Sequence, residues 1–174
     1  MPEMLYFRDA EKVFKQKKIS RDIHATLEYV EDVLYGSLHR GELLRQALDE
    51  MQWRENGNGE LKILDDRRYM YKGVKRGVAI EGNFSSYEYI LEGLLRLQIG
   101  FDKGKIETGV LMLTGLRSEK SAYGSSADLA KAEVEMLYPT ISLPVAVAIF
   151  DLGQSMILDE GGDRNGVSVQ ANDN

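Results

Sequence analysis

Cysteine is absent from this sequence of 174 residues, so the chain can form neither a disulfide bond nor a thiolate metal site. This absence fits a reducing compartment, and we expect a cytoplasmic protein. Long apolar runs are also lacking, and none approaches the roughly 20 residues that cross a bilayer. Residues 1–18 mix charged with apolar positions and do not form the apolar centre of a signal peptide. We therefore expect neither secretion nor a membrane partner.

Two families of catalytic signature are missing as well. The phosphate-binding pattern GxxxxGK[ST] does not occur, and no nucleophile motif supports Ser/His/Asp catalysis. Histidine is scarce: His24 and His39 have no second ligand at metal-binding spacing, which favours surface or capping roles. These absences exclude a nucleotide-binding P-loop and a serine-hydrolase site.

Positive charge is in deficit overall, with a formal net charge of −6. Most DNA-binding proteins are basic, because neutralising phosphates dominates their affinity. The charge is nevertheless uneven, and basic residues gather near the start and in the middle of the chain. These two clusters are Lys12, Lys15, Lys17, Lys18 and Arg21, and Arg67, Arg68, Lys72, Lys75 and Arg76. The general interpretation of such runs is a solvated face, so the charge alone does not decide for or against DNA.

The chain is long enough for one domain, and 43% of its residues are hydrophobic. We assign residues 1–158 to that domain and residues 159–174 to a flexible tail. Apolar spacing predicts helices over residues 19–34, 38–51, 85–99 and 127–137. Strand-like composition covers residues 61–83, 106–113 and 143–152. This order predicts an α/β fold, a mixed β-sheet flanked by helices.

The most informative segment runs from Gly77 to Asn83, where an apolar strand ends in a carboxylate. Alternation along the strand places Glu81 and Asn83 on the same side. Adjacent oxygen-bearing side chains can share Mg²⁺, which prefers oxygen ligands. The alternative, without a metal site, is a strand end that reaches solvent.

Residues 53–153 resemble the BglII/BstYI-like group of type II restriction endonucleases, within the PD-(D/E)xK nuclease superfamily. The residues that carry the resemblance read VKRGVAIEGNFSSYEYILEGLLRLQIGFDKGKIETGVLML, followed later by Leu143-Pro144-Val145. The shared order is a β-hairpin, a strand ending in Glu, a polar and aromatic turn, a long helix and two further strands. The resemblance covers more than half of the chain and implies a restriction-endonuclease-like fold.

The resemblance also implies roles for individual residues. Glu81 matches the acidic metal ligand of the family, and Gly82 stands where a backbone carbonyl commonly joins the metal. Asn83 stands where the family has Lys, Gln or Glu. Asparagine can position a water molecule but cannot act as a general base. The implied cofactor is Mg²⁺ or Mn²⁺.

The sequence departs from the family pattern at the first acidic residue, which is usually about ten residues before the glutamate. Counting back from Glu81 reaches Tyr71 or Lys72, and neither is a carboxylate. The nearest candidates are Asp65 and Asp66, and Asp66 precedes Glu81 by 15 residues (81 − 66). Either a longer hairpin brings Asp66 beside Glu81, or the site is incomplete and the protein does not cut DNA.

Three functional hypotheses follow. The first is a Mg²⁺-dependent DNA phosphodiesterase of the type II site-specific kind. It would act on double-stranded DNA as a homodimer. Its catalytic residues would be Asp66, Glu81 and Asn83, and its metal ligands would be Asp66, Glu81 and Gly82. In this case the central basic cluster, including Lys75 and Arg76, should flank the metal and hold the scissile phosphate. The second is a catalytically inactive nuclease-fold protein that binds DNA or protein. The third is a small partner protein of a plasmid or phage defence system.

Overall fold

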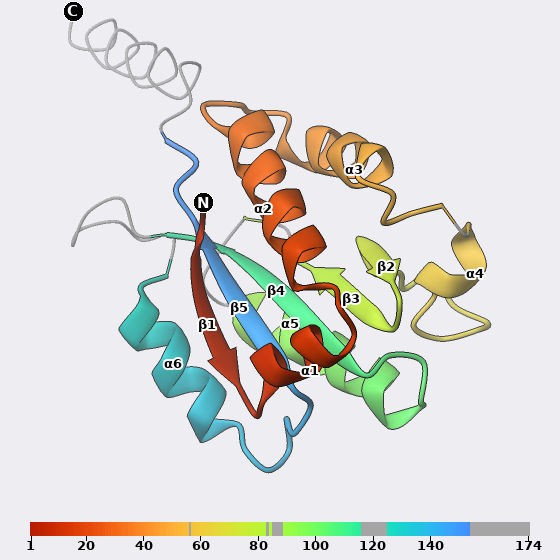
Figure 1. The fold of residues 1–174 in the computed structure, drawn as a ribbon. Coiled ribbons are helices and arrows are strands. Elements are labelled where there is room, and N and C mark those ends of the chain that lie inside the picture. The colour runs from red at the N-terminus through yellow and green to blue at the C-terminus, as the bar shows by residue number, and fades with distance from the viewer. Residues whose placement is uncertain (56, 83, 85–88, 116–124, 154–174) are drawn as a thin grey trace, which may run out of the picture.

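A five-stranded mixed sheet forms the centre of the computed structural model, which describes residues 1–55, 57–82, 84, 89–115 and 125–153 (Figure 1). The strands are β1 (Glu3–Phe7), β2 (Gly73–Lys75), β3 (Val78–Glu81), β4 (Thr108–Thr114) and β5 (Val145–Phe150). Their order across the sheet is β1-β5-β4-β3-β2. The three central strands β3, β4 and β5 are parallel, and the edge strands β1 and β2 are each antiparallel to their neighbour.

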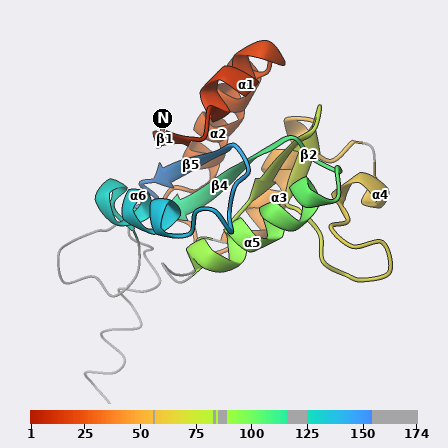
Figure 2. The same ribbon diagram turned by 90° about the horizontal axis from the view of Figure 1, so that it is seen from below.

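Helices cover both faces of this sheet (Figure 2). One face carries α1 (Ala10–Gln16), α2 (Ser20–Leu34) and α3 (Arg40–Glu50). The other carries α5 (Tyr89–Asp102) and α6 (Ala127–Met136), which lie in the β3–β4 and β4–β5 connections. Both crossover helices lie on the same face because the chain moves in one direction from β3 to β4 to β5, and such crossovers are right-handed. The short helix α4 (Asn58–Leu61) precedes the β2–β3 hairpin.

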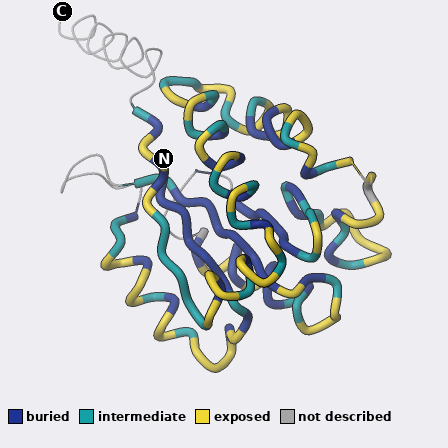
Figure 3. Tube along the Cα trace, viewed as in Figure 1, coloured by how far each residue is buried: buried dark blue, intermediate teal, exposed yellow. Residues whose placement is uncertain are grey.

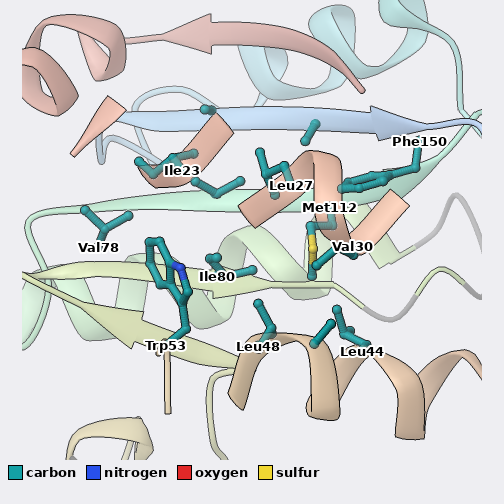
Figure 4. Close-up of a cluster of buried hydrophobic side chains, with 14 of the residues drawn as sticks. Ile23, Leu27, Val30, Leu44, Leu48, Trp53, Val78, Ile80, Met112 and Phe150 are labelled. Carbon is teal, nitrogen blue, oxygen red and sulfur yellow. The ribbon is translucent and has the colours of Figure 1, made fainter. Parts of the chain in front are cut away.

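The sheet separates two apolar cores, and its central strands are buried on both sides (Figure 3). On the α2 and α3 face, Ile23 and Leu27 meet Val78 and Ile80, with Trp53 beside them (Figure 4). On the α5 face, Ala79 packs with the apolar residues of α5 and α6. The residues of β3 therefore alternate between the cores, as expected for period-two strand geometry.

Most of the predicted elements are confirmed. The helices α2, α3 and α6 lie within two residues of the predicted bounds, and Ser126 caps α6 by accepting a hydrogen bond from the backbone N–H of Leu129. The helix α5 ends at Asp102 and not at Ile99; the predicted start of that helix, residues 85–88, lies outside the described residues.

The backbone differs from the expectation in two places. Residues 1–18 contain an edge strand and a helix that the sequence pattern did not indicate. Residues 61–71 were expected to be strand-like, but they form a turn closed by one isolated bridge between Lys62 and Met70. Of the region 61–83, only β2 and β3 are strands, joined by a tight reversal at Arg76 and Gly77, which both have positive φ.

None of the helices in the described part of the chain has the length and apolar character needed to cross a membrane. The predicted tail, residues 159–174, lies outside the described residues.

Candidate functional site

Glu81 is the last residue of β3, at the carboxyl end of a central strand, as the sequence predicted. It lies on the same side of the strand as Ala79 and therefore faces α5. Its exposed fraction is 0%, and it is the only charged side chain among the described residues that is fully buried. The alternative of a strand end that reaches solvent is therefore wrong, because this carboxylate lies in the interior. A buried charge requires compensation nearby, so its neighbours decide what the site can do.

The guanidinium of Arg96, on α5, is the cation beside this carboxylate. Arg96 Nη1 lies 3.6 Å from Glu81 Oε2, and Arg96 Nη2 donates to Glu92 Oε1 at 3.2 Å. The guanidinium also stacks over the ring of Tyr69, 5.9 Å from its centroid. The ion pair between Arg96 and Glu92 follows from their spacing of four residues on a helix. The pair with Glu81 was missed, because sequence spacing does not reveal contacts between a strand end and a helix.

Tyr71 stands on the other side of the same carboxylate. Its ring is buried, and its hydroxyl donates a hydrogen bond to the backbone carbonyl of Arg96 at 2.8 Å. Burial raises the pKa of this phenol far above its usual value, and the negative charge of Glu81 raises it further. The hairpin register pairs Gly73 with Ile80, so the chain just before β2 runs beside the end of β3. The resemblance expects an aspartate at Tyr71 or Lys72, so that part of the chain lies beside Glu81, and the buried side chain there is the neutral phenol of Tyr71.

Asp65 and Asp66 lie on the exposed turn before β2. Asp65 pairs with Lys105 at 2.5 Å, and Lys105 also donates to the Lys62 carbonyl. The lysine lowers the pKa of the Asp65 carboxyl by hydrogen bonding and by its charge. Because Lys105 precedes β4, this ion pair holds the turn toward the amino ends of the parallel strands, whereas Glu81 is at a carboxyl end. Asp66 is exposed on this turn, while Glu81 is buried.

Gly82 directly follows Glu81, and its backbone N–H donates to Glu81 Oε1 at 3.2 Å. Its φ is 141°, and a Cβ at this position would lie 2.5 Å from the carbonyl oxygen of Met112 on β4. Only glycine tolerates both conditions, which explains the residue type without reference to a metal. Asn83, the predicted water-positioning residue, lies outside the described residues.

The central basic cluster does not surround Glu81 as expected. Lys75 points to the opposite face, where Nζ donates to Asp22 Oδ2 and to the Met51 carbonyl, both at 2.8 Å, and lies over the ring of Trp53. Arg76 is exposed at the hairpin reversal, at the other end of β3 from Glu81. The prediction that Lys75 flanks the site is therefore wrong, because the side chains of a strand alternate between faces. Arg67 and Arg68 remain exposed, next in sequence to Tyr69.

The fold has counterparts among solved structures. The restriction endonuclease BglII in complex with a DNA 16-mer superposes with a TM-score of 0.56 at 11% identity, over 89% of this chain and 77% of that one. Free BglII gives a TM-score of 0.57 at 14% identity, over 86% and 79%. The chain has a restriction-endonuclease-like fold. No family model matches the sequence, and no curated protein matches it either.

The restriction-endonuclease-like fold implies a divalent cation, but the described residues around Glu81 do not fit one. No group of three or more His, Asp or Glu side chains in the described part of the chain is arranged to hold a metal ion. A hard cation needs several oxygen ligands, whereas Glu81 is flanked by a guanidinium and by a phenol that donates elsewhere. The arrangement can hold a buried carboxylate in a fixed orientation. The loop residues Arg117, Lys120 and Tyr123, considered for DNA contact, lie outside the described residues.

Proposed function

We propose that this chain is a DNA-binding protein that keeps the restriction-endonuclease-like fold but does not hydrolyse DNA. The observation that carries the proposal is Tyr71, which fills the place beside Glu81 where the family pattern has a second carboxylate. Two carboxylates can share a cation that activates water and stabilises the phosphate, and one carboxylate with a phenol cannot. The neighbouring Arg96 supports the same conclusion, since it brings positive charge to Glu81 without a metal.

The proposed DNA contact is the exposed turn that carries Arg67 and Arg68. Both side chains are exposed, and the next residue, Tyr69, stacks on Arg96 at the site. Arginines on this turn would meet the phosphates of a duplex that lies against it. The BglII structure with its DNA 16-mer shows that a protein of this fold holds DNA, and we extend that mode of binding to this chain as a proposal.

A second candidate is the Mg²⁺-dependent phosphodiesterase, favoured by the position of Glu81 at a strand end directly before Gly82 and a helix. In this version Asp66 moves to Glu81 and shares Mg²⁺ or Mn²⁺ with it and with the Gly82 carbonyl, and Asn83 positions water. Both candidates include a homodimer on double-stranded DNA, because a two-fold protein matches a two-fold site.

Fluorescence anisotropy with a labelled duplex tests DNA binding, at low and at moderate salt. We expect weak binding that falls steeply as salt rises, since phosphate contacts release counterions. The double substitution Arg67→Glu and Arg68→Glu should abolish it. The matched control is Lys12→Glu with Arg21→Glu, which changes the net charge equally but alters exposed residues on the α1 and α2 side. Equal loss in both variants would mean that binding depends on net charge alone, and the proposed surface would be wrong.

Cleavage of supercoiled plasmid with Mg²⁺ or Mn²⁺ separates the two candidates. Binding without nicking in the wild-type protein supports the non-cleaving proposal. Metal-dependent nicking that Glu81→Gln abolishes would overturn it in favour of the phosphodiesterase. Loss of nicking in Asp66→Asn as well would then assign the second carboxylate.

A further inference from the structure

The side chain of Glu81 is completely buried, and a buried carboxylate that loses its cationic partner destabilises a protein strongly. In metal nucleases a divalent cation compensates such a charge, and the described residues here form no such site. The positive charge beside Glu81 comes instead from within the chain, from the middle of α5.

We propose that Arg96 is a built-in counter-ion that takes the place of a divalent cation at Glu81 and closes the site to metal. This inference deepens the proposed function, on which it rests, but it concerns the protein alone and is tested without DNA. The sequence pattern did not indicate this role for Arg96. The spacing of four residues indicates only an exposed ion pair with Glu92.

The geometry around the guanidinium fits this role. Its two terminal nitrogens face different carboxylates, Nη1 toward buried Glu81 and Nη2 toward Glu92, which is 58% exposed. One positive charge thus lies between two negative ones, as a bound cation would. Arginine suits a partly buried site because its charge is delocalised and weakly hydrated.

Two tyrosines hold Arg96 in place. The ring of Tyr69 stacks on the guanidinium from the turn before β2. Tyr71 donates to the backbone carbonyl of Arg96 and fixes α5 against the hairpin. The Tyr71 side chain also packs closely on α5, because a Cβ added at Gly100 would overlap the Tyr71 hydroxyl oxygen. The residue at the expected aspartate position therefore helps to position the arginine that replaces the metal.

The test is thermal unfolding of the full chain with and without millimolar Mg²⁺ or Mn²⁺. Arg96→Met should lower the melting temperature by on the order of 10 °C, since it removes the cationic partner of a buried carboxylate. The metal should leave the wild type unchanged and raise the melting temperature of Arg96→Met, because Glu81 and Glu92 then face a gap without a cation. Arg96→Lys, which keeps the charge, should lose less stability than Arg96→Met and should not respond to metal.

Two further variants separate charge from packing. Glu81→Gln combined with Arg96→Met removes both charges and should recover much of the lost stability without any response to metal. This double variant should fold even if Arg96→Met alone does not. Lys15→Met is the matched control, because it breaks an exposed pair with Glu11 at the same i,i+4 spacing, and its melting temperature should change by only about 1 °C.

Several outcomes would overturn the inference. One is a loss in Arg96→Met as small as that in Lys15→Met. Another is a double variant no more stable than Arg96→Met, which would make the arginine a packing residue. A wild-type protein stabilised by Mg²⁺ as much as Arg96→Met would mean that the native site already accepts the cation. Stabilisation of the wild type by Mg²⁺ would contradict the counter-ion role of Arg96, but it would not contradict DNA binding.

Discussion

Tyr71 limits the chemistry of the site because its hydroxyl already donates a hydrogen bond within the protein. The phenol donates to the Arg96 carbonyl, and its burial together with the neighbouring charge of Glu81 raises its pKa and keeps it protonated. A neutral donor in this place fixes the helix α5 and adds no negative charge that could attract a cation. The residue therefore fixes α5 against the hairpin and, under the proposed function, fills the place of a second metal ligand.

Replacing Tyr71 with Phe should lower the free energy of unfolding by about 1 kcal/mol at neutral pH, because one buried hydrogen bond is lost. The pH dependence should also change. The folded-state pKa of Tyr71 is raised above its ordinary value of 10.0, so the unfolded chain loses this proton first. The stability of the wild type must then fall as the pH rises above about 10, and it should fall less steeply in Tyr71→Phe. Urea unfolding at neutral pH and at several pH values above about 10 measures both effects, and identical slopes would contradict the second.

Gly82 is the residue where the backbone itself limits substitution. Gly82→Ala should destabilise the protein by about 3 kcal/mol, since the new Cβ meets the Met112 carbonyl and φ is positive. Gly41→Ala is the control: this glycine lies in α3 with nothing within 4 Å of an added Cβ, so the change should stabilise by about 0.5–1 kcal/mol. Chemical denaturation decides, and a Gly82→Ala variant as stable as the wild type would rule out the close approach of β3 and β4.

At the scale of elements, the sequence predicted those segments whose burial follows a simple period. The helices α2, α3 and α6 each bury one face against the sheet, so their apolar spacing matches their structure. The edge strand β1 pairs on one side only and is half-buried, and α1 spans only seven residues, so neither leaves a clear pattern. In residues 61–71, tertiary packing outweighs the local preference for strand. Leu61, Ile63 and Tyr71 are buried by packing against the core and not by strand pairing.

The same distinction applies to the site. An apolar strand that ends in a carboxylate is visible in the sequence, and it located Glu81 correctly. Its neighbours Arg96 and Tyr71 reach it through helix packing and hairpin register, which one sequence does not specify. The alternation of β2 also sends Lys75 to the other face, although the run of basic residues is continuous in the sequence.

The packing of α2 against the end of α3 depends on one buried hydrogen bond, in which Trp53 Nε1 donates to Thr26 Oγ1 at 2.9 Å. Thr26→Val keeps the shape but leaves the indole N–H without its acceptor, so we expect a loss of about 1–3 kcal/mol. Trp53→Phe removes the donor, and adding Thr26→Val to it should then cost much less. Equilibrium unfolding of the four proteins in this double-mutant cycle measures the coupling. Strictly additive losses would show that the hydrogen bond contributes nothing.

At the scale of the whole molecule, the helices on one side of the sheet carry exposed apolar side chains. The helices α5 and α6 lie on the same side of the sheet (Figure 2). Four of their large apolar side chains are substantially exposed. These are Leu91 and Leu95 on α5, and Leu129 and Met136 on α6. Apolar surface of this kind on one layer is typical of a protein interface. Part of this apolar surface, Leu91 and Leu95, lies on α5, which also carries Arg96. An interface through α5 would therefore lie close to the Glu81 site.

We therefore predict that the expected homodimer forms through this helical face. Leu91 and Leu95 are 53% and 49% exposed and lie one helical turn apart, so a two-fold axis near α5 would bury both pairs. The double substitution Leu91→Glu with Leu95→Glu should give a monomer without loss of fold, because neither side chain belongs to a core. Leu38→Glu, at an exposed leucine between α2 and α3, is the control and should leave the dimer intact. Size-exclusion chromatography with light scattering gives the masses. A monomeric wild type would contradict the homodimer itself, whereas a dimer that survives both sets of substitutions would place its interface on another surface.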